Sequence, residues 1–224
     1  MIFQRRLSKG FNFNGSYTYS SASTWNQIIN EYDAAPLQWT PTNSPLPNRF
    51  NATGIYELPF GHGRTYLKSG ALGHVIGNWQ VALTYDFQQG PFLSWGNNFY
   101  YGDLKTVGET LTQGAKTLDR WFNTSAPFER NSANQPAAFQ ARIFPVDVTS
   151  VRADGLNQFN ANLRRDFRLR EGMIFEVRVD ALNLLNRSQF SAPDNNPNNT
   201  TFGKVTSATA TLNRFYQIQG RIRF

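Results

Sequence analysis

The last fourteen residues of this 224-residue chain, TLNRFYQIQGRIRF, alternate between apolar and polar side chains. Counted back in twos, one face carries Phe224, Ile222, Gly220, Ile218, Tyr216 and Leu212, with Arg214 as the exception. The other face carries mainly Arg, Gln and Asn. A period of two predicts an extended strand with two unlike faces. Chain ends usually fray in water, so a long strand that ends on an aromatic residue favours an outer-membrane β-barrel.

The amino-acid composition is that of a β-rich protein. Aromatic residues make up 15% of the chain and charged residues only 17%, against about 25% charged residues in typical soluble domains. Asn, Phe, Tyr, Thr and Gly are plentiful, which favours strands over helices. The mean hydropathy of −0.49 argues against membrane-spanning helices. It is compatible with a barrel, because half of every barrel strand is polar.

Two further counts restrict the function. The chain has no cysteine, which excludes disulfides, thiolate metal sites and a cysteine nucleophile. The net charge of +7 could indicate nucleic-acid binding, but the arginines stand singly at alternating positions, so we expect no nucleic-acid partner.

The first ten residues, MIFQRRLSKG, lack the features of a signal peptide, which an outer-membrane protein needs. We therefore expect this chain to be a fragment.

Five earlier segments show the same alternation and are predicted strands, after a partial strand at residues 1–7. They cover residues 11–20, 49–58, 78–88, 158–169 and 173–181. In the hairpin formed by the last two, pairing Phe167 with Phe175 keeps both faces in register. The same register places Leu169 opposite Met173. The predicted fold is all-β, an antiparallel up-and-down transmembrane barrel, present here as an incomplete curved sheet of about six full strands and one partial strand.

The connections between these strands alternate in length. Long loops are predicted at about residues 21–48, 96–155 and 186–204. Short strands are expected inside the second loop, around residues 140–148. The connections after Leu7, Leu58 and Leu169 are short or medium. This alternation matches outer-membrane barrels, which have short periplasmic turns and long extracellular loops, and it places Phe224 on the periplasmic side.

The alternation also assigns the side chains of each strand to one of two environments. Residues expected to face lipid are Trp79, Val81, Leu83, Tyr85, Phe87, Phe175, Val177, Val179, Tyr216, Ile218 and Ile222. Arg165 interrupts this apolar face. Residues expected to face the lumen are Arg164, Asp166, Arg168, Glu176, Arg178, Asp180, Arg221 and Arg223. These charges could form a ladder that solvates the lumen and pairs with a lumenal domain, or they could contact an anionic substrate.

Four stretches resemble TonB-dependent outer-membrane receptors. They are YELPFGHGR at 56–64, GNWQVALTYDFQQGPF at 77–92, RVDALNLLNRSQF at 178–190 and NRFYQIQGRIRF at 213–224. The resemblance covers nearly the whole chain and is strongest to the C-terminal part of large Oar-like members, which carry a carboxypeptidase-regulatory-like N-terminal domain. It implies a barrel of about 22 strands with a plug domain in its lumen. It also implies energy-coupled uptake of a large or scarce substrate through the inner-membrane TonB complex.

Compared with that family, the plug, the TonB-contacting segment and about two thirds of the barrel are missing from this chain. The resemblance therefore implies a fragment that does not transport alone, in the bacterial cell outer membrane. Its implied partners are outer-membrane lipid, its own missing plug and strands, and the TonB complex through the absent N-terminal part. Phe224 is implied to be the terminal aromatic signal that the barrel-assembly machinery reads.

Candidate metal and catalytic residues are few. His62 and His74 are the only histidines and have no acidic pair at ligand spacing, so we expect surface histidines and no metal site. The loop Asp194–Asn199 could coordinate calcium through oxygen ligands, although we expect a solvated loop. No serine has the context of a nucleophile elbow. We expect no enzymatic activity and no cofactor.

Two other classes of protein remain open at this point. A soluble β-sandwich, such as a carbohydrate-binding module, would bury its aromatic faces against a second sheet. A segment of a passive porin would share the barrel and differ only in what lies upstream in the chain. A single curved sheet with a bare aromatic face would favour the membrane barrel over the sandwich.

Overall fold

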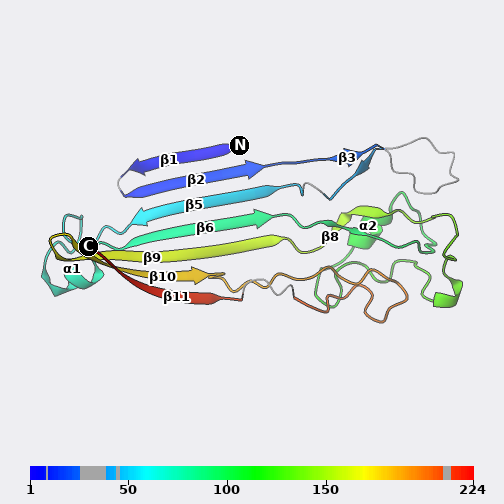
Figure 1. Ribbon diagram of the computed structural model, residues 1–224. Helices are drawn as coiled ribbons and strands as arrows, with labels where there is room; N and C mark the ends of the chain where they lie inside the picture. The colour runs from blue at the N-terminus through cyan, green and yellow to red at the C-terminus, as the bar shows by residue number, and fades with distance from the viewer. Residues whose placement is uncertain (9, 26–38, 44–45, 209–212) are drawn as a thin grey trace.

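A seven-stranded antiparallel sheet forms the body of the protein (Figure 1). The computed structural model describes residues 1–8, 10–25, 39–43, 46–208 and 213–224. In spatial order the strands are β1 (Ile2–Ser8), β2 (Phe11–Thr18), β5 (Arg49–Glu57), β6 (Gln80–Gln88), β9 (Leu156–Arg170), β10 (Met173–Leu182) and β11 (Phe215–Arg223). Much of the predicted loop 21–48 and the start of the predicted terminal strand lie outside the described residues.

The hydrogen-bonded register keeps like faces together across the sheet. Val81 of β6 lies opposite Leu163 of β9. Phe167 of β9 lies opposite Phe175 of β10, which confirms the predicted pairing. Because side chains alternate along every strand, this register gathers apolar residues on one face of the sheet and most charged residues on the other.

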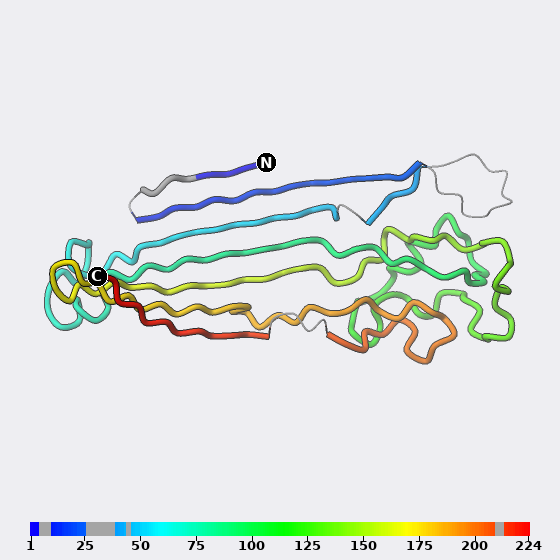
Figure 2. The backbone as a smooth tube through the Cα atoms, viewed as in Figure 1, coloured from blue at the N-terminus to red at the C-terminus, as the bar shows by residue number. Residues whose placement is uncertain are grey.

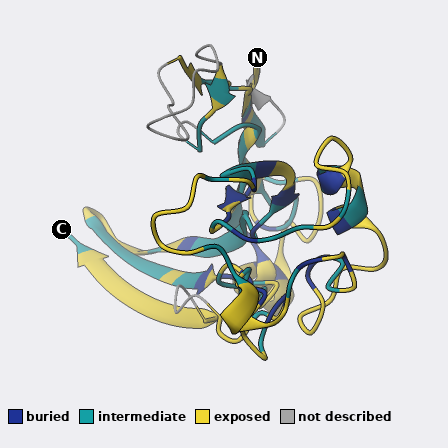
Figure 3. Cartoon of the chain, turned by 90° about the vertical axis from the view of Figure 1, so that its right-hand side faces the viewer, coloured by how far each residue is buried: buried dark blue, intermediate teal, exposed yellow. Residues whose placement is uncertain are grey.

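The sheet is open. β1 and β11 lie at its opposite edges, and within the described residues each pairs with one neighbour only (Figure 2). A view along the strands shows the sheet as an arc with the two termini far apart (Figure 3). Because an odd number of antiparallel strands separates its edges, β1 and β11 run in the same direction. The predicted fold class, an incomplete antiparallel barrel sheet, is confirmed.

The turn between β9 and β10 differs from the prediction by one position. Met173 lies opposite Arg170, so the predicted pairing of Met173 with Leu169 is wrong. A bulge between Met173 and Ile174 absorbs the extra residue, and Gly172 at the end of the turn has φ of 75°. A left-handed glycine at this position produces such a bulge in hairpins with short loops. Leu169 is consequently 56% exposed.

The long connections gather into a folded unit at one end of the sheet, which we call the cap (Figure 1). It contains β7 (Phe92–Ser94) paired with β8 (Asp147–Arg152), the helix α2 (Val107–Thr112) and the 3₁₀ helix η1 (Ser132–Asn134). The two-residue strands β3 (Ser23–Thr24) and β4 (Thr40–Pro41) pair with each other. The amide of Trp121 donates to the carbonyl of Gly203 at 2.8 Å, and that of Val205 donates to Leu118 at 2.8 Å. The second and third predicted loops therefore fold together.

The buried hydrophobic core lies in the cap. Trp95 is 3% exposed and packs against four phenylalanine rings at centroid separations of 5.1 to 6.4 Å. By contrast, Ile218 and Ile222 on the apolar face of β11 are 76% and 51% exposed. In the described part of the chain the other two sheets have two strands each, and neither covers this face as a sandwich would. The bare apolar face favours the membrane barrel.

The short connections lie at the other end of the sheet, which we call the turn end. The connection between β5 and β6 contains a helix, α1 (Gly70–Ile76), near the C-terminus and the β9–β10 turn (Figure 1). None of the described helices is long and apolar enough to cross a bilayer. The large cap and the shorter connections thus lie at opposite ends of the sheet.

Replacing Trp95 with alanine should loosen the cap. The change removes the side chain at the centre of the aromatic cluster and should cost about 3–5 kcal/mol of local stability. We expect faster proteolysis and faster hydrogen exchange within residues 96–155. Phe139→Ala is the matched control, since Phe139 is 101% exposed. Equal protection in both variants would contradict the assignment of this cluster as the core.

Candidate functional site on the charged face of the sheet

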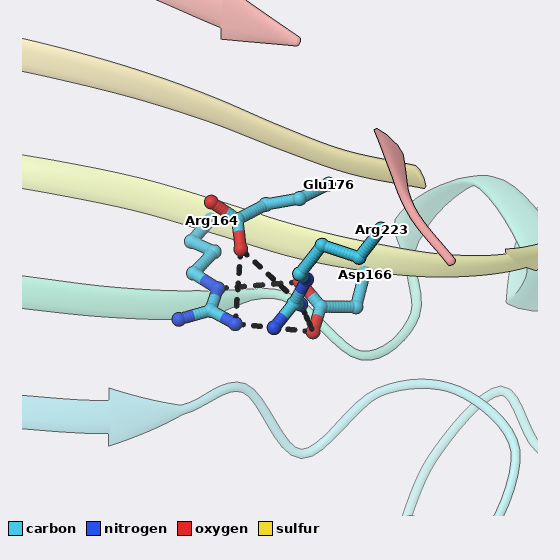
Figure 4. Close-up of polar contacts among 4 residues, drawn as sticks. All are labelled: Arg164, Asp166, Glu176 and Arg223. Atoms are coloured by element: carbon cyan, nitrogen blue, oxygen red, sulfur yellow. Dashed lines mark hydrogen bonds and ion pairs between the residues drawn. The ribbon is translucent and has the colours of Figure 1, made fainter. Parts of the chain in front are cut away.

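Four charged residues from the last three strands form a closed ionic network on the polar face (Figure 4). Arg164 contacts Asp166 and Glu176, each at 3.1 Å. Arg223 contacts the same two carboxylates at 2.8 and 3.3 Å. Each cation therefore bridges both anions, and β9, β10 and β11 are tied together across two strand interfaces. We call these four residues the ionic network.

The strand register explains why the network is diagonal. Asp166 lies directly opposite Glu176, and Arg164 lies directly opposite Arg178. Like charges directly opposite each other on neighbouring strands are destabilising. Arg164 and Arg223 contact Glu176 diagonally, and these contacts together with those to Asp166 compensate this repulsion. These side chains are 13–40% exposed, so the pairs are only partly screened by solvent.

The other predicted lumen-facing charges behave differently from one another. Arg178 contacts Asp180 at 2.8 Å, and the amide of Asn162 donates to the same carboxylate at 2.6 Å. Arg168 and Arg221 are exposed and make no ion pair with another described residue. The structure thus brings four of the eight predicted residues into one network and two into a separate pair, and it leaves two arginines open on the same face.

A cavity of about 760 Å³ lies beside the network at the turn end. Its lining includes Glu57, His62, Arg64, His74, Asn78, Gln80, Arg164, Arg165, Asp166 and Arg168. Arg64 contacts Glu57 at 2.7 Å. Cations outnumber carboxylates in this lining, so the cavity favours an anionic group. Within the described residues no group of His, Cys, Asp and Glu could hold a metal ion, and the two histidines do not form one.

Arg165 is the residue whose role sequence reasoning missed. It lies on the apolar face but is only 6% exposed. Its guanidinium donates to the backbone carbonyls of His74 and Val75 in the last turn of α1. It also lies 4.2 Å from the ring centre of Phe167 and 5.8 Å from that of Trp79. A lone arginine between Leu163 and Phe167 on an apolar face was the signal, but its partner Val75 is 90 residues away in the chain.

The residues predicted to face lipid share one face of the sheet. Their aromatic rings contact each other across strands: Tyr85 lies 6.0 Å from Phe50 and 6.4 Å from Phe159 between ring centres. Phe167 and Phe175 are 6.3 Å apart. Trp79 lies just before β6 and donates its indole N–H to the carbonyl of Val75 at 3.1 Å. Such cross-strand aromatic pairs stabilise the sheet without a covering layer.

In the cap, an ion pair joins the segment just before β9 to the third predicted loop. Arg187 binds Asp154 through both carboxylate oxygens at 2.7 and 3.1 Å, and the amide of Phe190 donates to it at 3.0 Å. Burial raises the pKa of the Asp154 carboxyl, but the hydrogen bonds and charge of Arg187 outweigh burial. The net pKa is therefore below its ordinary value.

The carboxylate of Asp194 is hydrogen-bonded by other residues of its own loop. The carboxylate of Asp194 accepts hydrogen bonds from the Asn196 amide, the Asn199 side chain and the Thr201 hydroxyl. Burial raises the pKa of Asp194, but these three bonds leave it below its ordinary value. The loop is thus built around an internally satisfied carboxylate, and it contributes Phe202 to the cap core.

Comparison with protein families identifies the class. A family model for an outer membrane beta barrel domain matches residues 1–219 of the chain. The chain belongs to this family. No curated protein and no solved structure gives a match. The predicted location in the bacterial outer membrane is thereby confirmed. The family description covers outer-membrane barrels as a class and does not specify receptors of the TonB-dependent kind.

Asp154→Asn should destabilise the cap of this outer-membrane barrel near neutral pH. Loss of charge-assisted hydrogen bonds to a mostly buried carboxylate should cost roughly 1.5–3 kcal/mol. Because the folded pKa is depressed, this stability is present above the unfolded pKa of about 4 and is lost as pH falls through the folded pKa. We expect proteolytic protection of the cap to decline below about pH 4 in the unmodified protein.

The matched control is Asp119→Asn, which neutralises an exposed carboxylate in the same cap. It should change cap protection little at any pH. If Asp154→Asn kept full protection at neutral pH, the ion pair with Arg187 would not be what holds this part of the cap.

Proposed function

We propose that the chain is the C-terminal barrel part of a TonB-dependent outer-membrane receptor for energy-coupled uptake of a large or scarce substrate. The observation that carries the proposal is the ionic network on the polar face of an open sheet. A charged, partly buried network is costly in lipid but suits a lumen that holds water or another domain. The resemblance of residues 56–64, 77–92 and 178–190 to such receptors points the same way.

The shape of the sheet supports a wide barrel. Lipid cannot satisfy the backbone groups at the edges of β1 and β11, so both edges need further strands. A barrel with an even number of antiparallel strands requires an odd number beyond the seven described. A barrel of about 22 strands would require about 15 more. The lumen of such a barrel is wide enough to need a plug.

On this proposal the polar face meets the lumen and the plug. The eight predicted lumen-facing residues comprise five arginines and three carboxylates, so the face is net positive. A plug surface with carboxylates would complement Arg168 and Arg221, which make no ion pair among the described residues. An anionic substrate on its way through the lumen would meet the same charges.

The apolar face, on the same proposal, meets outer-membrane lipid. The free aromatic Phe224 follows β11 directly and is 90% exposed, which leaves it accessible to the barrel-assembly machinery. Contact with the TonB complex would belong to an N-terminal part of the receptor and not to these strands. The proposal includes no catalytic step, no cofactor and no nucleic-acid partner.

A passive porin is the second candidate, because it would use the same sheet around an empty lumen. The two candidates differ in conductance. A full receptor reconstituted in a planar bilayer should show little steady ion conductance, because its plug fills the lumen. A passive porin should conduct steadily. Steady ion conductance from the unmodified, complete receptor would therefore contradict the receptor proposal.

Weakening the ionic network should open the plugged receptor. We expect Arg164→Gln combined with Arg223→Gln to raise the leak conductance of the full chain several-fold, because both cations that hold Asp166 and Glu176 are lost. The matched control is Arg170→Gln, which removes an exposed arginine at the β9–β10 turn, outside the network. Equal conductance in the two variants would show that the network does not support the plug.

A further inference from the structure

We infer that α1 is an interfacial helix whose apolar side enters the periplasmic leaflet of the outer membrane. The inference rests on the proposed function, because it uses the assignment of the apolar sheet face to lipid and of the turn end to the periplasm. Its partner is the phospholipid surface beside the barrel wall. Nothing in the sequence pattern of the strands predicts this helix.

The helix exposes a continuous apolar stripe. Leu72, Val75 and Ile76 are 63%, 67% and 42% exposed. Their spacing of i, i+3 and i+4 places them on one side of α1. Leu67, just before the helix, is 40% exposed, and Gly73 is the only buried residue of α1. A soluble connector has no reason to present such a stripe to water, whereas an interfacial helix does.

Two side chains from the apolar face of the sheet hold the helix in place. Arg165 donates to the carbonyls of His74 and Val75, and the indole N–H of Trp79 donates to the carbonyl of Val75. Both residues alternate in step with Val81 and Leu163 on the apolar face. The end of α1 is therefore bound to the face that we assign to lipid.

The connector is shaped to hold this position. Gly61 and Gly77 cross so closely that a side chain on either would collide with the backbone of the other. A side chain on Gly73 would collide with the carbonyl of Leu67. These two close backbone contacts constrain both ends of the segment that presents the apolar stripe.

The same arrangement explains the buried cation. Arg165 would be costly on a lipid-facing surface unless its donors were satisfied. The carbonyls at the C-terminus of α1 carry partial negative charge and accept hydrogen bonds from both terminal nitrogens of Arg165, although its Nε has no hydrogen-bond partner among the described residues. The helix covers Arg165 while its own stripe remains exposed beside Trp79. Aromatic residues such as Trp79 and the 58% exposed Tyr66 are typical of the membrane–water interface.

Spin labels on single cysteines test the inference, since these 224 residues contain no cysteine. The full chain is reconstituted in phospholipid vesicles with a label at Leu72→Cys or Val75→Cys. Collision with oxygen, which concentrates in lipid, is compared with collision with a water-soluble nickel chelate. We expect both labels to collide several-fold more with oxygen, relative to nickel, than a label at Thr65→Cys, which is exposed and polar in the same connector.

A label at Leu83→Cys, in the middle of the apolar face, distinguishes a failure of the inference about α1 from a failure of the proposed function. If Leu83 is accessible to oxygen while Leu72 and Val75 resemble Thr65, the helix is in water and the inference is overturned, but the proposed function stands. If Leu72 and Val75 collide with neither reagent, protein covers the stripe and the inference is also overturned. If Leu83 itself collides mainly with nickel, the lipid assignment of the apolar face is wrong and the proposed function fails with it.

Discussion

The structure depends on one constraint, which is the register of the backbone ladder from β1 to β11. Because side chains alternate, a slip of one residue between β9 and β10 would bring Arg164 and Asp166 to the face of Phe167. In a bilayer that exchange would place charges in lipid. The bulge beside the β9–β10 turn shows how the chain accommodates its turn without such a slip, since Leu169 is absorbed there and the pairing from Ile174 and Arg168 onward keeps both faces.

The cap and the sheet have different distributions of apolar and polar residues, and the composition of the whole chain is an average of the two parts. The cap has the buried aromatic core and the satisfied carboxylates of a water-soluble domain, as Trp95, Asp154 and Asp194 show. The sheet has a bare apolar face and places its charges on the opposite face. This division explains why a chain with an outer-membrane fold has a negative mean hydropathy. The cap buries its aromatic core, whereas the sheet leaves apolar residues such as Ile218 and Ile222 exposed.

The sequence predicted the sheet well because its signal is local. Alternation along the chain predicted five strands of the large sheet, β2, β5, β6, β9 and β10, to within two residues at each end, but not the short strands outside it. The cap could not be predicted in this way, because Trp95, Phe144 and Phe202 meet only through contacts between distant segments. The contact of Arg165 with α1 has the same origin. The ionic network lies between these cases, since its residues were predicted but its diagonal pairing follows from the register.

The position of the network within the sheet bears on how the barrel closes. β11 is an edge strand, and Arg223 takes part in the network while Arg221, directly opposite Glu176, is exposed. The strand that completes the ladder beside β11 will place side chains next to both arginines. Arg223 already has two carboxylate partners that compensate its charge, whereas Arg221 makes no ion pair with another described residue. Carboxylates beside Arg221 would extend the network across the closing interface, so the electrostatics of this edge favour an acidic lumen-facing residue on the neighbouring strand.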